Sequence, residues 1–264
     1  MADPYSRIAD LDAATVNYLA ERLETRGSDP RQQRLWRDFL SRLPALGGGR
    51  VLEVGCGTGL VTQQIAGLPG VAEATGIDPS SGLVEYARRR LPHARFEVAD
   101  GRDLPFDNET FDAVVFATTL CHIPEPDRAL AEAHRVLRPK GCLLVYDGDY
   151  ATTTVALTAD DPLEACVRDA VQSVVYNPWL IRDLASLVRS CGYQLDELHS
   201  HGHIEQESPT YMLSIVDHGT DQLQARGTIS ETTAATLKDE ARRRAAAGAF
   251  FGFIAYASLL AIRD

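Results

Sequence analysis

The sequence of 264 residues has little that would place it in or across a membrane. It contains no apolar run of about 18 residues, the length at which a hydrophobic stretch becomes a candidate membrane-spanning helix. Its N-terminus has no signal-peptide pattern. Cysteines are few, five in number, and no two form a C-x-x-C pair. An odd set of scattered cysteines is typical of reduced thiols, so we expect a cytoplasmic protein without disulfide bonds.

Positive charge is also scarce, since the formal net charge is −11. A phosphate backbone is bound mainly by clustered Lys and Arg, so the balance argues against a nucleic-acid partner. The short basic runs at 88–90 and 242–244 fall inside helical patterns and are interpreted as solvated helix faces. There is no internal repeat and no low-complexity linker. A hydrophobic content of 45% is enough for one sizeable core, so we expect one structural domain with added segments.

A glycine-rich stretch at residues 50–60 is the most informative part of the sequence. The apolar run 51–54 predicts a buried strand, and the residues from Leu60 onward predict a helix. Gly55 and Gly57 have no Cβ, so the chain can turn sharply there and a ligand can lie against its backbone. The dinucleotide fingerprint needs a third glycine where this chain has Leu60, which disfavours a nicotinamide cofactor.

Strands and helices alternate along the first 150 residues. The pattern predicts helices over 12–26 and from 29 to 43 as an N-terminal addition, and then a regular succession of strands and helices. This alternation argues for a doubly wound parallel sheet. The strands are predicted at 51–54, 71–77, 94–99, 111–117 and 142–146.

Five segments in this order and spacing resemble class I S-adenosylmethionine (SAM) dependent methyltransferases, and in particular the small-molecule enzymes similar to those of ubiquinone and menaquinone biosynthesis. The resemblance covers roughly residues 30–150. The segments are VLEVGCGTG at 51–59, GIDPS at 76–80, FEVADGRDLPF at 96–106, FDAVVFATTLCHI at 111–123 and RVLRPKG at 135–141.

The resemblance implies SAM as the cofactor and assigns its contacts. Asp78, followed by Pro79, would hold the ribose, and a carboxylate there has two oxygens for two vicinal hydroxyls. All the assigned residues lie at the carboxyl ends of predicted strands, where an open α/β sheet forms its ligand crevice. The methionine part would face Glu53, Gly55, Cys56 and Gly57, the adenine would meet Asp100 and Gly101, and the Thr118 carbonyl would meet the amino-acid end.

The resemblance also implies a fold: a Rossmann-like, doubly wound, seven-stranded sheet, mostly parallel with an antiparallel last strand, with N-terminal helices and a helical lid. We divide the chain into an N-terminal helical addition (1–45), a SAM-binding core (46–150), and a lid with the last two strands (151–264). The sixth strand is expected at 193–204 and the seventh at 250–262. Helices between them would cover the substrate.

Methyl transfer to a hydroxyl or an acidic carbon is helped by a general base. His122, just after the fourth strand, is the best candidate by chemistry and position. Asp147, Asp149 and Tyr150, expected at the carboxyl end of the fifth strand, are the next candidates as base or orienting groups. A purely structural or orienting role for His122 is an equal alternative.

Three alternating histidines, His199, His201 and His203, would share one face of a strand. No further ligand cluster is evident in the sequence, so we favour an edge strand with polar histidines over a zinc site and expect no metal. Cys56 and Cys121 near the crevice are interpreted as small core residues rather than nucleophiles.

The predicted function is therefore transfer of a methyl group from SAM to an oxygen, nitrogen or carbon of a small molecule. The alternative is a SAM-binding protein that does not methylate, such as a cyclase-type enzyme or a silent subunit, because cofactor motifs report binding rather than chemistry. The expected partner is the small-molecule acceptor, with neither nucleic acid nor membrane, and the chain would act as a monomer or homodimer.

Overall fold

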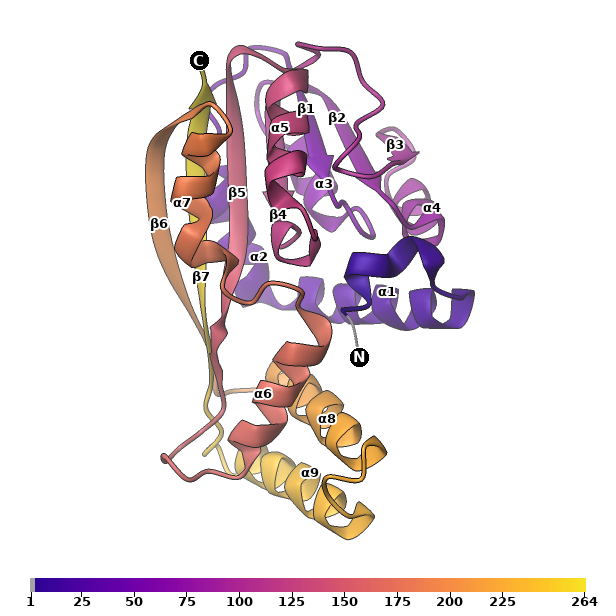
Figure 1. Ribbon diagram of the computed structural model, residues 1–264, viewed down its shortest axis with the longest axis vertical. Coiled ribbons are helices and arrows are strands. Elements are labelled where there is room, and N and C mark those ends of the chain that lie inside the picture. The colour runs from indigo at the N-terminus through magenta and orange to yellow at the C-terminus, as the bar shows by residue number, and fades with distance from the viewer. Residues whose placement is uncertain (1–2) are drawn as a thin grey trace.

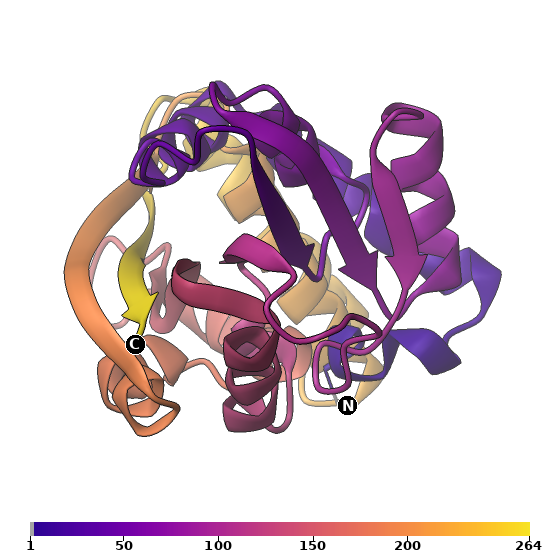
Figure 2. The ribbon, with the colours of Figure 1, turned by 90° about the horizontal axis from the view of Figure 1, so that it is seen from above.

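The computed structural model describes residues 3–264, which contain a seven-stranded sheet in the order β3-β2-β1-β4-β5-β7-β6 (Figure 1). The strands from β3 to β5 pair in parallel, whereas β7 runs antiparallel between β5 and β6. Seen from above, the strands fan out in a twist (Figure 2). The predicted Rossmann-like sheet with an antiparallel last strand is confirmed. The strands are β1 (Gly49–Val54), β2 (Val71–Asp78), β3 (Arg95–Val98), β4 (Phe111–Ala117), β5 (Leu137–Thr154), β6 (Tyr193–Glu205) and β7 (Gly252–Arg263).

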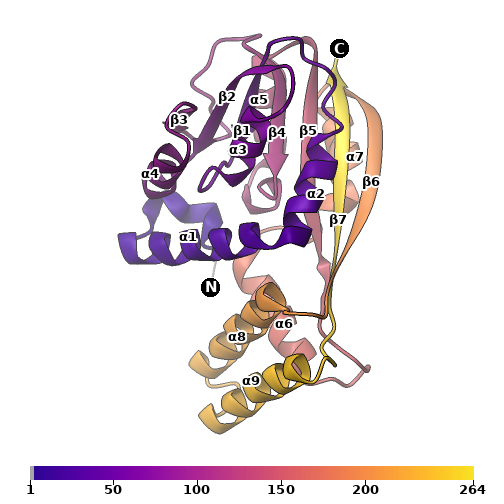
Figure 3. The same cartoon turned by 180° about the vertical axis from the view of Figure 1, so that it is seen from behind.

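Helices cover both faces of the sheet. On one face lie α5 (Pro126–Val136) and α7 (Leu180–Ser190), and on the other lie α2 (Pro30–Leu40) and α3 (Leu60–Ala66) (Figures 1 and 3). The central strands are therefore buried on both sides, which explains why their sequences are nearly continuous apolar runs. The remaining core helix is α4 (Ser81–Arg90), next to β3.

The first long helix, α1 (Ala13–Ser28), crosses below the carboxyl ends of the strands (Figures 1 and 3). Asp12 is its N-cap, because the Asp12 carboxylate accepts from the Thr15 amide at 3.0 Å. Asp29 caps α2 in the same way: it accepts from the Arg31 amide at 2.8 Å, and Pro30 occupies the first turn.

Three helices of the second half pack together beyond the end of the sheet (Figure 1). They are α6 (Leu163–Val174), α8 (Thr210–Ala225) and α9 (Glu231–Ala246). Long strands connect this helical part to the sheet. Across residues 3–264, no helix combines the length and apolar character needed to cross a bilayer.

Two features differ from the sequence-based expectation. Strand β5 extends to Thr154 rather than ending at Tyr146, so Asp147, Asp149 and Tyr150 lie within the strand and not at its carboxyl end. The reason is tertiary pairing, since β7 continues alongside β5 and supplies hydrogen-bond partners where the polar sequence alone favours a loop. The second is an unpredicted short 3₁₀ helix, η1 (Tyr5–Asp10), before α1.

Candidate functional site

The turn after β1 is built from glycines in left-handed conformations. Gly55, Gly57 and Gly59 have φ values of 74°, 53° and 80°. A Cβ added at Gly55 would lie 2.3 Å from the Cγ2 atom of Thr119, so this position tolerates no side chain. The turn leaves a bare backbone surface at the carboxyl end of the sheet.

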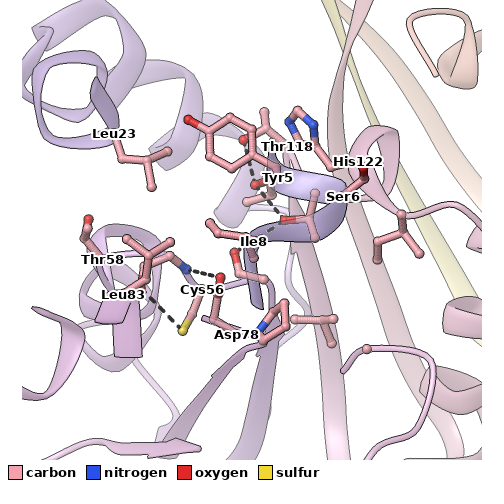
Figure 4. Close-up of a pocket in the computed structure, with 18 of the residues that line it drawn as sticks. Tyr5, Ser6, Ile8, Leu23, Cys56, Thr58, Asp78, Leu83, Thr118 and His122 are labelled. Carbon is pink, nitrogen blue, oxygen red and sulfur yellow. Dashed lines mark hydrogen bonds between the residues drawn. The ribbon is translucent and has the colours of Figure 1, made fainter. Parts of the chain in front are cut away.

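Asp78, the last residue of β2, is tied to that turn. Its carboxylate accepts hydrogen bonds from the Gly57 and Ser80 amides, each at 2.9 Å (Figure 4). The residue is buried, and burial raises the pKa of its carboxyl group to about 6, against the two amides, which lower it. One acidic side chain therefore both holds the glycine turn and presents an oxygen-rich edge to the cavity.

Glu53 lies inside β1 and is 2% exposed. The Thr62 hydroxyl donates to its carboxylate, but burial dominates and raises the pKa of Glu53 to about 8. The side chain is consequently mostly protonated at neutral pH. It can donate a hydrogen bond as well as accept one.

The pKa of Asp100 is shifted in the opposite direction, below its usual value. Its carboxylate forms an ion pair with Arg102, with 2.7 Å between Asp100 Oδ2 and Arg102 Nη2. Because Arg102 stabilises the ionised carboxylate, this contact lowers the pKa of Asp100. Thr118 follows β4 with a positive φ of 55°, rare for a residue with a branched side chain. Its hydroxyl donates to the Ala117 carbonyl at 2.7 Å and accepts from Arg26 Nη1 at 3.3 Å.

All nine residues assigned to the cofactor line one cavity at the carboxyl ends of β1, β2 and β4 (Figure 4). The cavity encloses about 330 Å³, within the range of small-molecule sites. The sequence therefore brings together the predicted positions Glu53, Gly55, Cys56, Gly57, Asp78, Pro79, Asp100, Gly101 and Thr118.

Sequence reasoning missed most of the opposite wall. Helix η1 lies over the cavity, and its buried Ile8 packs against Leu19 of α1 and Leu83 of α4. The last turns of α1 add Arg22 and Arg26, and α8 adds Tyr211. A six-residue 3₁₀ segment is too short to show a helical period, so the apolar Ile8 between polar neighbours is the signal that could have indicated it.

His122, in the short 3₁₀ helix η2 (Leu120–His122), lines the cavity. Its Nδ1 atom is 2.8 Å from Asp3 Oδ2. Its ring lies beside that of Tyr5, with 4.7 Å between the two centroids (Figure 4). The buried Asp3 carboxylate also accepts from the Tyr5 and Tyr176 amides, each at 2.9 Å. An acidic partner at Nδ1 favours the tautomer with its proton there, which leaves Nε2 able to accept a proton.

The other candidate bases are placed differently. Tyr150 is buried and lines the cavity, and burial raises the pKa of its hydroxyl well above the usual value. Asp149 forms an ion pair with Arg182 at 2.9 Å and does not line the cavity. Asp147 is fully buried and accepts from the Cys121 amide at 3.1 Å. Of the four, the structure brings only His122 and Tyr150 to the cavity.

The alternating histidines of β6 do not converge on one point. Each is next to a different group: His199 meets Glu197, His201 meets Ser258, and His203 meets Glu205. Among the described residues, potential ligand atoms of Asp29, His203 and Glu205 lie within 4.8 Å of one another. Glu205 there already contacts His203 and also accepts from the Met212 amide at 3.1 Å, so hydrogen bonding accounts for this cluster.

Comparison with known proteins agrees with this geometry. Residues 52–145 match the family described as "Methyltransferase domain". The chain is 35% identical over 170 residues to the O-methyltransferase cnsE of Penicillium expansum, covering 61% of this chain and 58% of that protein. It is 31% identical over 150 residues to the ubiquinone/menaquinone biosynthesis C-methyltransferase UbiE of Citrifermentans bemidjiense, covering 54% of this chain and 61% of that one. The chain thus spans about six tenths of these relatives.

The fold has relatives among solved structures. The [4+2]-cyclase SpnF superposes with a TM-score of 0.58 at 22% identity, covering 88% of this chain and 82% of that structure. At this identity the likeness concerns the fold. The glycine turn, the sheet order and the matches together show a Rossmann-like fold whose residues 52–145 are similar to the methyltransferase domain family, including the ubiquinone/menaquinone biosynthesis methyltransferases.

Proposed function

We propose that this chain binds SAM and transfers its methyl group to an oxygen, nitrogen or carbon of a small molecule. The observation that carries the proposal is one cavity that combines a glycine turn without side chains, two buried acids on β1 and β2, and a histidine oriented by a carboxylate. The similarity to proteins named as O- and C-methyltransferases supports the reaction class.

The residues present fit the cofactor. Asp78 has carboxylate oxygens for the ribose hydroxyls, and Gly55 and Gly57 leave room for the methionine part next to Glu53. Asp100 and Gly101 would meet the adenine, and the Thr118 carbonyl the amino group. The protonated Glu53 expected at neutral pH can donate to an acceptor atom of the ligand, while Asp78 accepts.

When bound, SAM supplies an electrophilic methyl group. The work of this chain is then to align the acceptor, exclude water and take up the proton that the acceptor loses. Orientation of bound reactants can contribute about 7–11 kcal/mol at the upper end. Helix η1, with Tyr5 and Ile8 over the cavity, would exclude water.

His122 is the proposed general base, because Asp3 holds its Nδ1 and leaves Nε2 to accept the proton. The Asp3 carboxylate stabilises the imidazolium that results. Tyr150, with its pKa raised by burial, stays a neutral phenol and would orient the acceptor by a hydrogen bond.

A second candidate function has one observation in its favour. The structural likeness to a [4+2]-cyclase leaves open the use of the same architecture by a SAM-binding protein that does not transfer methyl groups. Such a protein would need the cavity's shape but no base.

Calorimetry with SAM, S-adenosylhomocysteine and NAD tests cofactor choice, and mass spectrometry of candidate acceptors tests transfer. We expect binding of the first two compounds, none of NAD, and a mass gain of one CH₂ unit on the true acceptor. Binding of NAD alone would refute the proposal. Binding of SAM with an acceptor that rearranges without gaining mass would favour the cyclase-type alternative.

A further inference from the structure

Two arginines on α1 face the cavity without an acidic partner. Arg22 and Arg26 are one helical turn apart, so they lie on the same face of α1, and both line the cavity. Within residues 3–264 neither forms an ion pair with a carboxylate. Two other arginines near the cavity are paired, Arg90 with Glu24 and Arg102 with Asp100. In a chain with a net charge of −11, two unpaired cations on one wall need an explanation.

Of the two arginines, Arg26 is the more informative, because part of its guanidinium has no hydrogen-bond partner among the described residues. Its Nη1 donates to Thr118 Oγ1, but its Nε and Nη2 are buried and have no hydrogen-bond partner in the described chain. The rings of Tyr211 and Tyr256 lie 5.7 Å from its Cζ atom and stabilise the charge without accepting its N–H groups. Unsatisfied donors on a buried guanidinium lower the stability of the folded protein when no ligand is bound.

The unsatisfied pair has a specific geometry. Nε and Nη2 lie along one edge of the planar guanidinium, and their parallel N–H bonds match the two oxygens of a carboxylate. The buried hydroxyl of Tyr256, next to the same guanidinium, also has no partner among the described residues. The free donors of Arg26 thus have the shape of a fork that matches a planar oxyanion, rather than that of a single point charge.

Arg22 and Arg26 lie on the wall opposite the acidic residues that are assigned to the cofactor. Glu53, Asp78 and Asp100 lie on the strand side, where the cofactor's hydroxyl and amino groups would bind. Arg22 and Arg26 lie on the α1 side, beside Tyr5, whose pKa is raised to about 12, mainly by burial, although both arginines lower it. Tyr5 in turn packs against His122. The cationic wall is therefore next to the candidate base.

We propose that the methyl acceptor carries a carboxylate, held by Arg26 through its Nε and Nη2 with Arg22 adding positive charge. This inference rests on the proposed methyl transfer and names the class of acceptor for the same site. The amino-acid end of the cofactor also carries a carboxylate that Arg26 would be able to bind. The experiment below separates the carboxylate of the acceptor from that of the cofactor.

The test titrates the S-adenosylhomocysteine complex by calorimetry with hexanoate, benzoate and 4-hydroxybenzoate, each beside its uncharged amide. We expect at least one acid to bind about tenfold tighter than its amide, the scale of a hydrogen bond to a charged group. Arg26→Gln should abolish this preference, Arg26→Lys should restore only part of it, and Arg22→Gln should reduce it. Arg34→Gln, which removes an exposed charge from α2, is the matched control and should bind as wild type does.

The cofactor arm compares S-adenosylhomocysteine with 5′-methylthioadenosine, which lacks the amino-acid end. Arg26→Gln should leave the affinity for both unchanged. If it weakens only S-adenosylhomocysteine and the acids still exceed their amides, Arg26 serves the cofactor and our proposal is overturned. Absence of any acid preference in the wild-type complex overturns it as well. Failure of the wild type to bind S-adenosylhomocysteine would instead refute the proposed function, and thermal melts identify variants that do not fold.

Discussion

Asp78 gives the most quantitative prediction, because its ionisation should control cofactor affinity. In the free protein burial raises the pKa of this carboxyl group to about 6. The ribose hydroxyls of a bound nucleoside would donate to its ionised form, so binding should favour ionisation and release a proton. Affinity for S-adenosylhomocysteine should then rise with pH through about 6 and level off above 7.

The size of the effect follows from the same value. One unit below the pKa only about one carboxyl in ten is ionised, so affinity at pH 5 should be about tenfold lower than its plateau, or ~1.4 kcal/mol. Asp78→Asn should bind more weakly at every pH, by about 1–3 kcal/mol, because the amide cannot accept from both the Gly57 and Ser80 amides as the carboxylate does. Its affinity should be flat between pH 5 and 7.

Calorimetry over pH 5 to 7 measures this directly. The comparison variant is Asp100→Asn: Arg102 keeps the pKa of Asp100 low, so that group is ionised throughout and its replacement should leave the pH slope intact. A flat wild-type profile would refute the reasoning. The same slope in Asp78→Asn would show that another group is titrating.

Three further predictions concern other parts of the site. Burial raises the pKa of Glu53 from 4.5 to about 8, so the folded state keeps a proton that the unfolded chain loses. The free energy of unfolding should therefore fall as the pH rises from 5 to 8, by at most about 4 kcal/mol. Glu53→Gln should flatten that slope in urea unfolding, and an unchanged slope would contradict the assignment. His122→Ala should lower turnover by roughly 10²–10⁴ with S-adenosylhomocysteine affinity kept; near-normal turnover would leave the histidine an orienting role. In hydrogen exchange, S-adenosylhomocysteine should slow residues 5–28 more than β1 and β4, and equal protection beforehand would indicate a preformed wall.

Local chemistry explains why the strand side of the site could be predicted. The turn at Gly55 and Gly57 requires positive φ, and only glycine adopts it freely, so the requirement is visible in the sequence itself. Asp78 and Asp100 could be placed because each lies at the carboxyl end of a predicted strand. Parallel strands bring such residues to one edge of the sheet whatever the details of packing.

The α1 side could not be predicted in the same way. Asp3 and His122 are 119 positions apart, and their contact depends on how η1 folds back over the sheet. Nothing local distinguishes Asp3 from a solvated acid. Arg26 did carry a signal, since it continues the apolar stripe of Val16, Leu19 and Leu23 at helical spacing. A charged residue on a buried stripe indicates a partner, but not which one.

The extent of β5 was underestimated for a related reason. Asp147, Gly148 and Asp149 are poor strand formers, and they are extended only because Ala257, Tyr256 and Ala255 of β7 lie opposite them. Pairing with a strand more than a hundred residues later overrides local preference. The whole polar end of β5 therefore depends on the last part of the chain.

The position of β7 has a consequence for biosynthesis. Because β7 lies between β5 and β6, the edge strand β6 has no other strand to pair with, and β5 has an open edge until residues 252–263 leave the ribosome. The first five strands can assemble during translation, but the sheet closes only after the final strand inserts between two strands that are already made. Such late, long-range pairing is slow, and unpaired edges promote aggregation. Nascent or C-terminally shortened chains should thus depend on chaperones far more than the finished protein does.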